Sequence, residues 1–354
     1  MPKTKLTDFD VTAANNSDIN SISTLGTAPA SNFDDAFREL MAQIAKAIAG
    51  TDAIKDTFAL GDPSDLTKRV RLDAGRVTTG NTRVLTIPDQ DMTLEPRFDR
   101  QFLSGLTISN NATDATNDID IATGVAASDD NTAPLPLINL AVLTKRLDAA
   151  WAVGTGNGGL DTGTIGNSIY HVWLIKRSDT GVVDALFSLS STSPTMPASY
   201  DLKRRVGAII RATGAILPFI QYGDYFYRSV PVQTVNTTNP GTSAVVVVNQ
   251  NIPNPPVSGQ IRAIMSVQLT SSITATSYAG LVTATGQADT APSTTLNNVV
   301  LRTGPSAGAY QSITNLEIPI DTSSQFRYRL STSDVSVTIS VITHGWVDTR
   351  GKGS

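Results

Sequence analysis

The segment NFDDAFRELMAQIAKAIAG, residues 32–50, carries the apolar spacing of an amphipathic helix in a chain that otherwise favours strands and turns. Its large apolar residues fall on one helical face: Phe33, Phe37, Leu40, Met41, Ile44 and Ile48. Ser31 is placed to cap the start of the helix and Gly50 to end it. Such a helix either packs on its own domain or packs against copies of itself or a partner protein.

The composition of the remaining chain favours β-structure. Charged residues make up only 16% of the 354 residues, and Thr, Ser, Asn and Gly fill the difference, as is typical of strands and turns. The net charge of −4 provides no broad basic field, which disfavours nucleic acid and anionic membranes as partners. The chain has no Cys and two His, so disulfides, thiolate metal sites and His-rich metal sites are not expected. No cofactor is expected either.

The start of the sequence, MPKTKLTDFD, lacks the apolar core of a signal peptide, and no apolar run approaches the length that spans a bilayer. We therefore expect a protein that is made in the cytoplasm and does not insert into a membrane.

Changes in composition along the chain predict five segments. These are an extended leader and the helix (1–56), a short β segment (57–96), a middle β-rich domain (97–230), a linker rich in Pro, Asn and Thr (231–258) and a C-terminal β-sandwich of jelly-roll type (259–354). The middle domain also contains a pattern consistent with a short helix at 137–151, before a glycine-rich loop. A piece as small as 57–96 buries little surface alone, so it needs neighbours, and identical chains would serve.

The first hundred residues resemble the virion-attachment ends of bacteriophage tail fibres and tail spikes. The resemblance rests on the order of three motifs: GTAPASNFDDAFRELMAQI, then F-x-x-G-D-x-x-D-x-T-K-x-V-x-L-D, then T-T-G-N-T-R-V-L-T-I-P-D-x-x-x-T-L. The stretch from LDAAWAVGTGNGG to LPFIQYGDYF also resembles a recurrent module of predicted phage tail proteins. The resemblance implies a homotrimeric fibre that docks on the virion through its N-terminus.

Few residue patterns indicate catalysis. Gly154, Gly156 and Gly159 spell G-x-G-x-x-G, but the surrounding sequence is not the strand and helix that a dinucleotide site requires, so a wide loop is expected. His171 and His344 lie in strand-like runs and are interpreted as packed, hydrogen-bonded residues. Carboxylate pairs suggest glycoside hydrolysis only as an alternative to strand edges and turns: Asp118/Asp120 and Asp129/Asp130.

The segment QYGDYFYRS, residues 221–229, is the densest aromatic cluster. Aromatic side chains with polar tips favour interfaces. The cluster is a candidate receptor-binding surface, or a plug at a trimer interface or domain junction: Tyr222, Tyr225, Phe226 and Tyr227.

These observations predict a mainly β, trimeric structural protein of a bacteriophage virion, without enzymatic activity. It is expected to be a short tail, collar or baseplate fibre, whose partners are other tail, collar or baseplate proteins and a glycan or protein receptor on the host surface. It would bind the host itself or carry a longer fibre. The alternatives are a glycan-degrading tail spike and a head or capsid decoration fibre.

Overall fold

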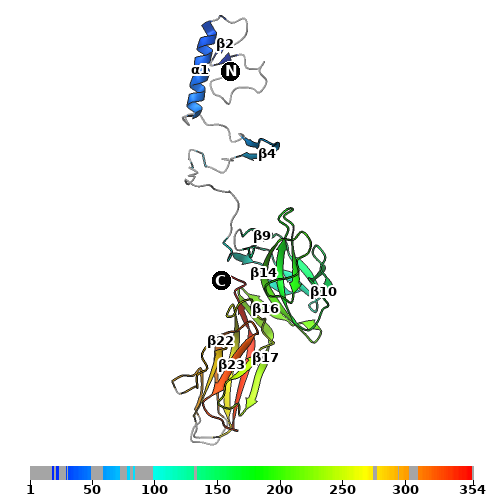
Figure 1. Cartoon of the computed structure of the whole chain (residues 1–354), viewed down its shortest axis with the longest axis vertical. Coiled ribbons are helices and arrows are strands. Elements are labelled where there is room, and N and C mark those ends of the chain that lie inside the picture. Colours follow the sequence, from blue (N-terminus) through cyan, green and yellow to red (C-terminus); the bar gives the residue numbers. More distant parts are fainter. Residues whose placement is uncertain are drawn as a thin grey trace. The chain divides into compact units, whose positions relative to one another are not determined.

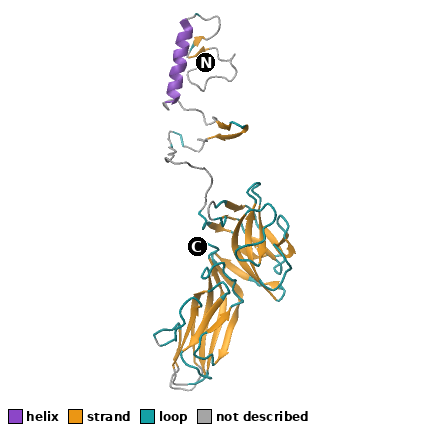
Figure 2. Cartoon of the chain, in the orientation of Figure 1, coloured by secondary structure: helices purple, strands orange, loops and turns teal. Residues whose placement is uncertain are grey.

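The structure, a computed structural model, divides the chain into two compact units, Met1–Met92 and Thr93–Ser354 (Figure 1). It describes residues 18–19, 21–23, 29, 31–48, 59–71, 78–79, 83, 99–130, 134–273, 277–293, 295–302 and 310–352. Each unit is considered by itself. The expected mainly β fold is confirmed, with one helix in the described part of the chain (Figure 2).

The N-terminal unit consists of one helix and two small hairpins. Helix α1 spans Ser31–Ile48, and the hairpins are β1 (Asp18–Ile19) with β2 (Ile22–Ser23) and β3 (Ala59–Asp62) with β4 (Asp65–Arg71). The helix is confirmed within two residues of the predicted bounds. Arg38 and Asp34 form an ion pair of 3.0 Å one turn apart on its surface. Of the rest of the expected β segment at 57–96, residues 72–77 and 84–96 lie outside the described residues.

The leader is not wholly extended. Its described residues form the β1–β2 hairpin, and both strands contact α1. The Ser21 main chain at the tip has a positive φ of 70°, a left-handed conformation. In the leader, which was expected to be extended, residues 18–19 and 21–23 therefore form a hairpin that packs on the helix.

The second unit begins with a strongly curled, barrel-like sheet of eight strands, in the order β15-β14-β12-β13-β11-β10-β7-β6 (Figure 2). In chain order these strands are β6 (Ile108–Asn110), β7 (Asp118–Ile121), β10 (Leu143–Ala150), β11 (Asn157–Leu160), β12 (Ile169–Lys176), β13 (Val183–Ser188), β14 (Leu202–Ala212) and β15 (Ala215–Ile216). The two ends of the sheet meet where the Ile216 amide donates to the Thr116 carbonyl at 2.8 Å. Three further strands form a separate small sheet: β5 (Leu103–Gly105), β8 (Gly124–Ala127) and β9 (Pro136–Asn139).

Two more sheets complete the second unit. The five-stranded sheet has the order β16-β17-β24-β19-β22 and the four-stranded sheet β18-β23-β20-β21. Their strands are β16 (Phe219–Tyr222), β17 (Tyr225–Thr238), β18 (Val245–Val248), β19 (Ile261–Ser271), β20 (Ser277–Ala284), β21 (Val299–Arg302), β22 (Tyr310–Pro319), β23 (Gln325–Leu330) and β24 (Val337–Asp348). Alternate residues of β19 and β23 are buried, and both strands contribute to one hydrophobic core. The two sheets therefore form a sandwich.

The sequence pattern of β12 is typical of a strand that is buried on both faces. Tyr170, Val172 and Leu174 join the main core, whereas Trp173 and Ile175 join a second cluster on the opposite face. Alternate residues of this strand therefore pack into two clusters on opposite faces. Because both faces are covered, the strand anchors the barrel-like sheet in the middle of the unit.

The short helix expected at 137–151 is wrong. The structure has strand β9 at the start of this range and strand β10 at its end. In β10 the residues Leu143, Lys145 and Leu147 are buried, and the residues between them are more exposed. This alternation is incompatible with a helix. The segment adopts a strand because it pairs with both β7 and β11.

The linker expected at 231–258 is also wrong. Strand β17 crosses residue 231 without interruption and pairs with β24 as far as Thr238. Strand β18, which also lies within this range, pairs with β23 of the four-stranded sheet. Pro, Asn and Thr residues suggested a linker here, but the β-branched residues among them fit the sheets well.

The glycines of the G-x-G-x-x-G pattern connect two strands. Gly154 and Gly156 have φ values of +100° and +75° in the loop between β10 and β11, and Gly159 lies in β11. The buried Lys145 ammonium holds this loop by donating to the carbonyls of Ala152 at 2.7 Å and of Gly154 at 3.2 Å. A strand follows the pattern instead of a helix, so it does not build a dinucleotide site.

Candidate interaction surfaces

Helix α1 exposes a row of large apolar side chains, here called the α1 stripe: Phe33, Phe37, Met41 and Ile44. Their exposed fractions are 79%, 56%, 57% and 41%. The spacings of four, four and three residues place them on one side of the helix. Of the other two residues predicted for this face, Leu40 is half-buried, and the side chain of Ile48 lies outside the described residues.

The side of α1 next to the stripe is already covered. Ala36 and Gln43 are buried, and the helix contacts β1 and β2. The helix therefore packs on its own leader through a small and a polar residue and leaves its largest apolar residues in solvent. Exposed apolar residues that form a continuous row mark an interaction surface more often than isolated ones do.

The structure divides the predicted aromatic cluster between the core and the surface. Phe226 is fully buried and stacks on Trp346, with ring centroids 5.4 Å apart and planes 6° apart. Tyr222, Tyr225 and Tyr227 are 66%, 39% and 36% exposed. Phe226 therefore belongs to the hydrophobic core and not to the exposed surface.

The three exposed tyrosines form the tyrosine patch on the β16–β17 hairpin. Tyr222 is paired with Tyr225 across the hairpin, and Tyr225 stacks on Tyr227 with centroids 6.2 Å apart and planes 11° apart. Alternation along the strand brings the tyrosines to one face and sends Phe226 to the other. The patch presents aromatic rings and hydroxyl groups together, which suits a polar interface.

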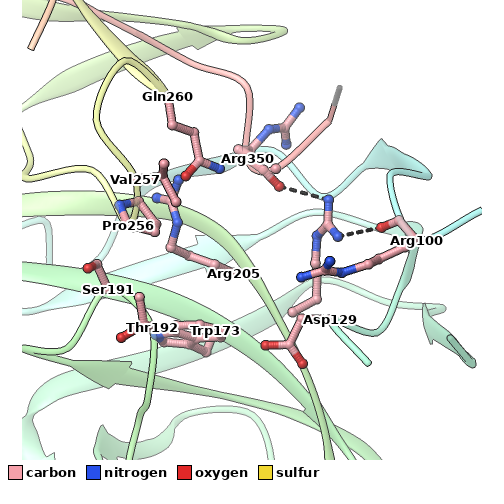
Figure 3. Close-up of a pocket in the computed structure, with 12 residues that line it drawn as sticks. Arg100, Asp129, Trp173, Ser191, Thr192, Arg205, Pro256, Val257, Gln260 and Arg350 are labelled. Atoms are coloured by element: carbon pink, nitrogen blue, oxygen red, sulfur yellow. Dashed lines mark hydrogen bonds between the residues drawn. The ribbon is translucent and has the colours of Figure 1, made fainter. Parts of the chain in front are cut away.

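A cavity of about 250 Å³, here called the arginine pocket, lies where the barrel-like sheet meets the sandwich. Figure 3 shows Trp173 and Thr192 on one side of it and Val257 and Gln260 on the other. Its lining is rich in arginine and also contains apolar and uncharged polar side chains: Arg100, Asp129, Trp173, Ser191, Thr192, Arg204, Arg205, Pro256, Val257, Gln260, Arg350 and Gly351.

Arg204 is the central cation of the pocket wall. Its side chain donates to the main-chain carbonyls of Arg100 at 2.6 Å and Arg350 at 2.8 Å, the two bonds marked in Figure 3. The residue is only 4% exposed, and its Nε has no hydrogen-bond partner. Burial lowers the pKa of Arg204 to about 10, well below its usual value. The nearby Asp129 carboxylate opposes this shift, and the neighbouring Arg205 guanidinium adds to it.

Arg205 and Arg350 are held by carboxylates. Arg205 makes a two-pronged contact with Asp348, at 2.8 and 2.6 Å, and both side chains are buried. Arg350 pairs with Asp224 at 3.2 Å and donates to the carbonyls of Gly105 and Leu106. These bonds connect strand β14, the end of β24 and the small sheet around the pocket.

His171 lies behind the pocket, fully buried in β12. Its Nε2 is 3.3 Å from Asn254 Oδ1, which confirms the expected packed and hydrogen-bonded role. The pKa of His171 is lowered from 6.5 to about 3, mainly by burial and in smaller part by the Arg205 charge. The imidazole is therefore neutral at physiological pH.

The structure places the candidate carboxylates in local hydrogen bonds. Asp120 accepts from Thr144 at 2.6 Å and from Asn111 at 2.9 Å, while Asp129 pairs with Lys203 at 3.1 Å. Burial raises the pKa of Asp118, and the nearby Asp114 charge adds to the rise. These contacts connect neighbouring strands and turns, as the simpler interpretation of the pairs expected.

His344 lies within hydrogen-bond distance of Ser266, a contact that the sequence did not indicate. His344 Nε2 lies 2.5 Å from the Ser266 hydroxyl, which is also 2.9 Å from Asn315 Oδ1. The three residues lie on adjacent strands, β24, β19 and β22, of the five-stranded sheet. They form a cross-strand hydrogen-bond network on the outer face of the sheet and do not line the arginine pocket.

Comparison with known proteins gives no family for this chain: no protein-family model and no curated protein matches it. Within the described residues, no helix is both long and apolar enough to span a bilayer. The same residues contain no group of three or more His, Cys, Asp or Glu side chains arranged to hold a metal ion.

Proposed function

We propose that this chain is a structural bacteriophage virion protein, a short fibre of the tail, collar or baseplate that docks on the particle through its N-terminal unit. The observation that carries the proposal is the α1 stripe, which is exposed although the helix already packs on its own hairpin. Burying a side chain such as Phe37 contributes about 1.5–3 kcal/mol. A row of four such residues therefore gains much from a partner surface.

The partner we propose for the stripe is two further copies of the chain. Three stripe residues, Phe33, Phe37 and Ile44, form the spacing of a coiled-coil seam together with the half-buried Leu40, with intervals of four, three and four residues. The sequence resemblance to phage fibre attachment ends favours three chains over two. In this homotrimer the sandwich corresponds to the jelly-roll-like outer domain, and its surface binds the host receptor or carries a longer fibre.

Multiple copies give such a fibre its binding strength. Three identical sites on each fibre, and many fibres on each particle, raise the overall affinity without a tight individual contact. The tyrosine patch is a suitable surface for one of these contacts, because its rings and hydroxyl groups are already exposed.

Replacing Phe37 with aspartate tests the docking role. We expect the purified variant to lose the trimer mass in light scattering and to be missing from phage particles grown with it, because each trimer would bury three unpaired charges. Circular dichroism of the β-rich unit should stay unchanged, since Phe37 belongs to the other unit.

The matched control is Val70→Asp, which places the same charge at a side chain that is 65% exposed on β4 of the same unit. It should assemble like the wild type. If the Phe37→Asp variant still forms a trimer and enters particles at the wild-type level, the stripe is not the docking surface. A wild-type protein that is monomeric at micromolar concentration would exclude the homotrimer.

A further inference from the structure

The charges around the arginine pocket do not balance. Arg205 is paired with Asp348, Arg350 with Asp224, and Asp129 with Lys203. Among the described residues, no carboxylate forms an ion pair with the two remaining lining arginines, Arg100 and Arg204. The cavity wall therefore has two arginines without an ion-pair partner, and the one carboxylate of the lining near Arg204, Asp129, is shared with Lys203.

The two arginines differ in what they offer a ligand. Arg204 is buried and fixed by main-chain carbonyls, so it contributes a permanent positive charge at a defined place. The Arg100 side chain is exposed, so its planar guanidinium is available for a two-pronged contact with an anion. A buried cation is costly without a counter-charge, which makes the site favourable for a negative group.

The cavity is larger than a bare anion requires. Its volume of about 250 Å³ equals the space of about eight water molecules. Trp173, Pro256 and Val257 supply apolar surface, while Thr192 and Gln260 supply uncharged hydrogen-bonding groups. A ring with several hydroxyl groups and one carboxylate matches this combination of size, apolar wall and polar groups.

We propose that the arginine pocket binds a carboxylate-bearing sugar residue, of the hexuronic acid class, with its carboxylate facing Arg100 and Arg204. The sugar ring then lies between the Trp173 side and the Val257–Gln260 side of the cavity. This inference rests on the proposed function for one point, the assignment of the sugar to the host surface. It names the class of receptor that the fibre would recognise.

The test is calorimetric titration of the purified full-length protein with glucuronate, glucose and inorganic phosphate. We expect glucuronate to bind at least about tenfold tighter than either of the others, because only glucuronate has both the charge and the ring. Affinity should fall with added salt, since the arginine charges attract the ligand.

Three variants locate the binding site. Arg204→Gln and Arg100→Gln should each weaken glucuronate binding about tenfold or more, the loss of one charge-assisted contact. Val257→Trp should abolish binding by filling the cavity, and its side chain is 64% exposed, so the fold should be unaffected. Arg262→Gln is the matched control: it removes the same charge at a surface pair with Glu317 and should bind normally.

Three results would overturn the proposal: glucuronate no tighter than glucose, phosphate as tight as glucuronate, or normal binding by Arg100→Gln and Val257→Trp. Because binding is measured on the isolated protein, these results say nothing about docking through α1. Conversely, particle assembly that is unaffected by Phe37→Asp would contradict the proposed attachment and leave the sugar-binding result intact.

Discussion

Arg205→Met should lower the free energy of unfolding of the β-rich unit by about 3–5 kcal/mol, because it leaves the buried Asp348 carboxylate without its partner. Both side chains are at most 5% exposed, and the contact is two-pronged. Burial by itself would raise the pKa of Asp348, but the Arg205 charge and hydrogen bonds hold it below its usual value. Denaturant unfolding followed by tryptophan fluorescence measures the change.

Two further variants separate the ion pair from simple loss of packing. The double variant Arg205→Met/Asp348→Leu should recover much of the lost stability, because no unpaired charge stays buried. Arg262→Met breaks an ion pair with Glu317 that is more than a third exposed, and it should change the stability by no more than about 1 kcal/mol. If Arg205→Met behaves like Arg262→Met, the buried pair does not hold the sheets together.

The β-rich unit should lose about 2–3 kcal/mol of stability between pH 6.5 and pH 4.5 through His171 alone. Its pKa is about 3 in the folded protein, against about 6.5 when unfolded. Below pH 6.5 the unfolded chain therefore binds a proton that the folded protein excludes. The contribution is full above pH 6.5 and is lost progressively as the pH falls toward 3. Urea unfolding at several pH values measures this slope.

His171→Gln should flatten the slope, since glutamine does not titrate and its amide is able to bond with Asn254 as the imidazole does. The chain has only one other histidine. His344→Gln makes the same substitution at this half-buried position and serves as the control for it. A wild-type protein with equal stability at pH 6.5 and pH 4.5 would show that His171 is accessible to protons in the folded state.

Periodicity and composition were enough to predict the elements whose environment follows from local sequence. The α1 stripe repeats with helical spacing over several turns, so its helix was predictable. Strand β12 was predictable because IYHVWLIK is a short run rich in aromatic and β-branched residues. The mainly β class follows from the abundance of β-branched and turn-forming residues.

The helix expected at 137–151 and the linker expected at 231–258 were wrong for a common physical reason. Residues 137–151 and 231–258 adopt strands because distant strands pair with them, as β24 does with β17. Such pairing is set by the tertiary fold and is weakly encoded in local sequence. Likewise, the sequence did not show that α1 buries Ala36 and Gln43 and exposes its larger residues, because this depends on the hairpin that covers it.

The arginine pocket was not predictable from spacing. Arg204 meets the Arg100 carbonyl across 104 residues and the Arg350 carbonyl across 146 residues. The one local signal is the pair Arg204–Arg205 inside LKRRVGAIIRA, a strand that is buried over most of its length. Two buried arginines in one strand indicate internal partners, but the sequence does not show which residues these are.

The order of strands in the five-stranded sheet affects how the protein is made. Strand β24 lies between β17 and β19. The middle position of this sheet is therefore filled by the last of its five strands to be synthesised. Thr338 of β24 pairs with Thr238 of β17, which leaves the ribosome 100 residues earlier. At ~5–20 residues per second, β17 waits about 5–20 s with one edge open. During this time, neighbouring nascent chains on one messenger RNA expose the same unpaired strand edge. Chaperones or sister chains therefore have access to that edge.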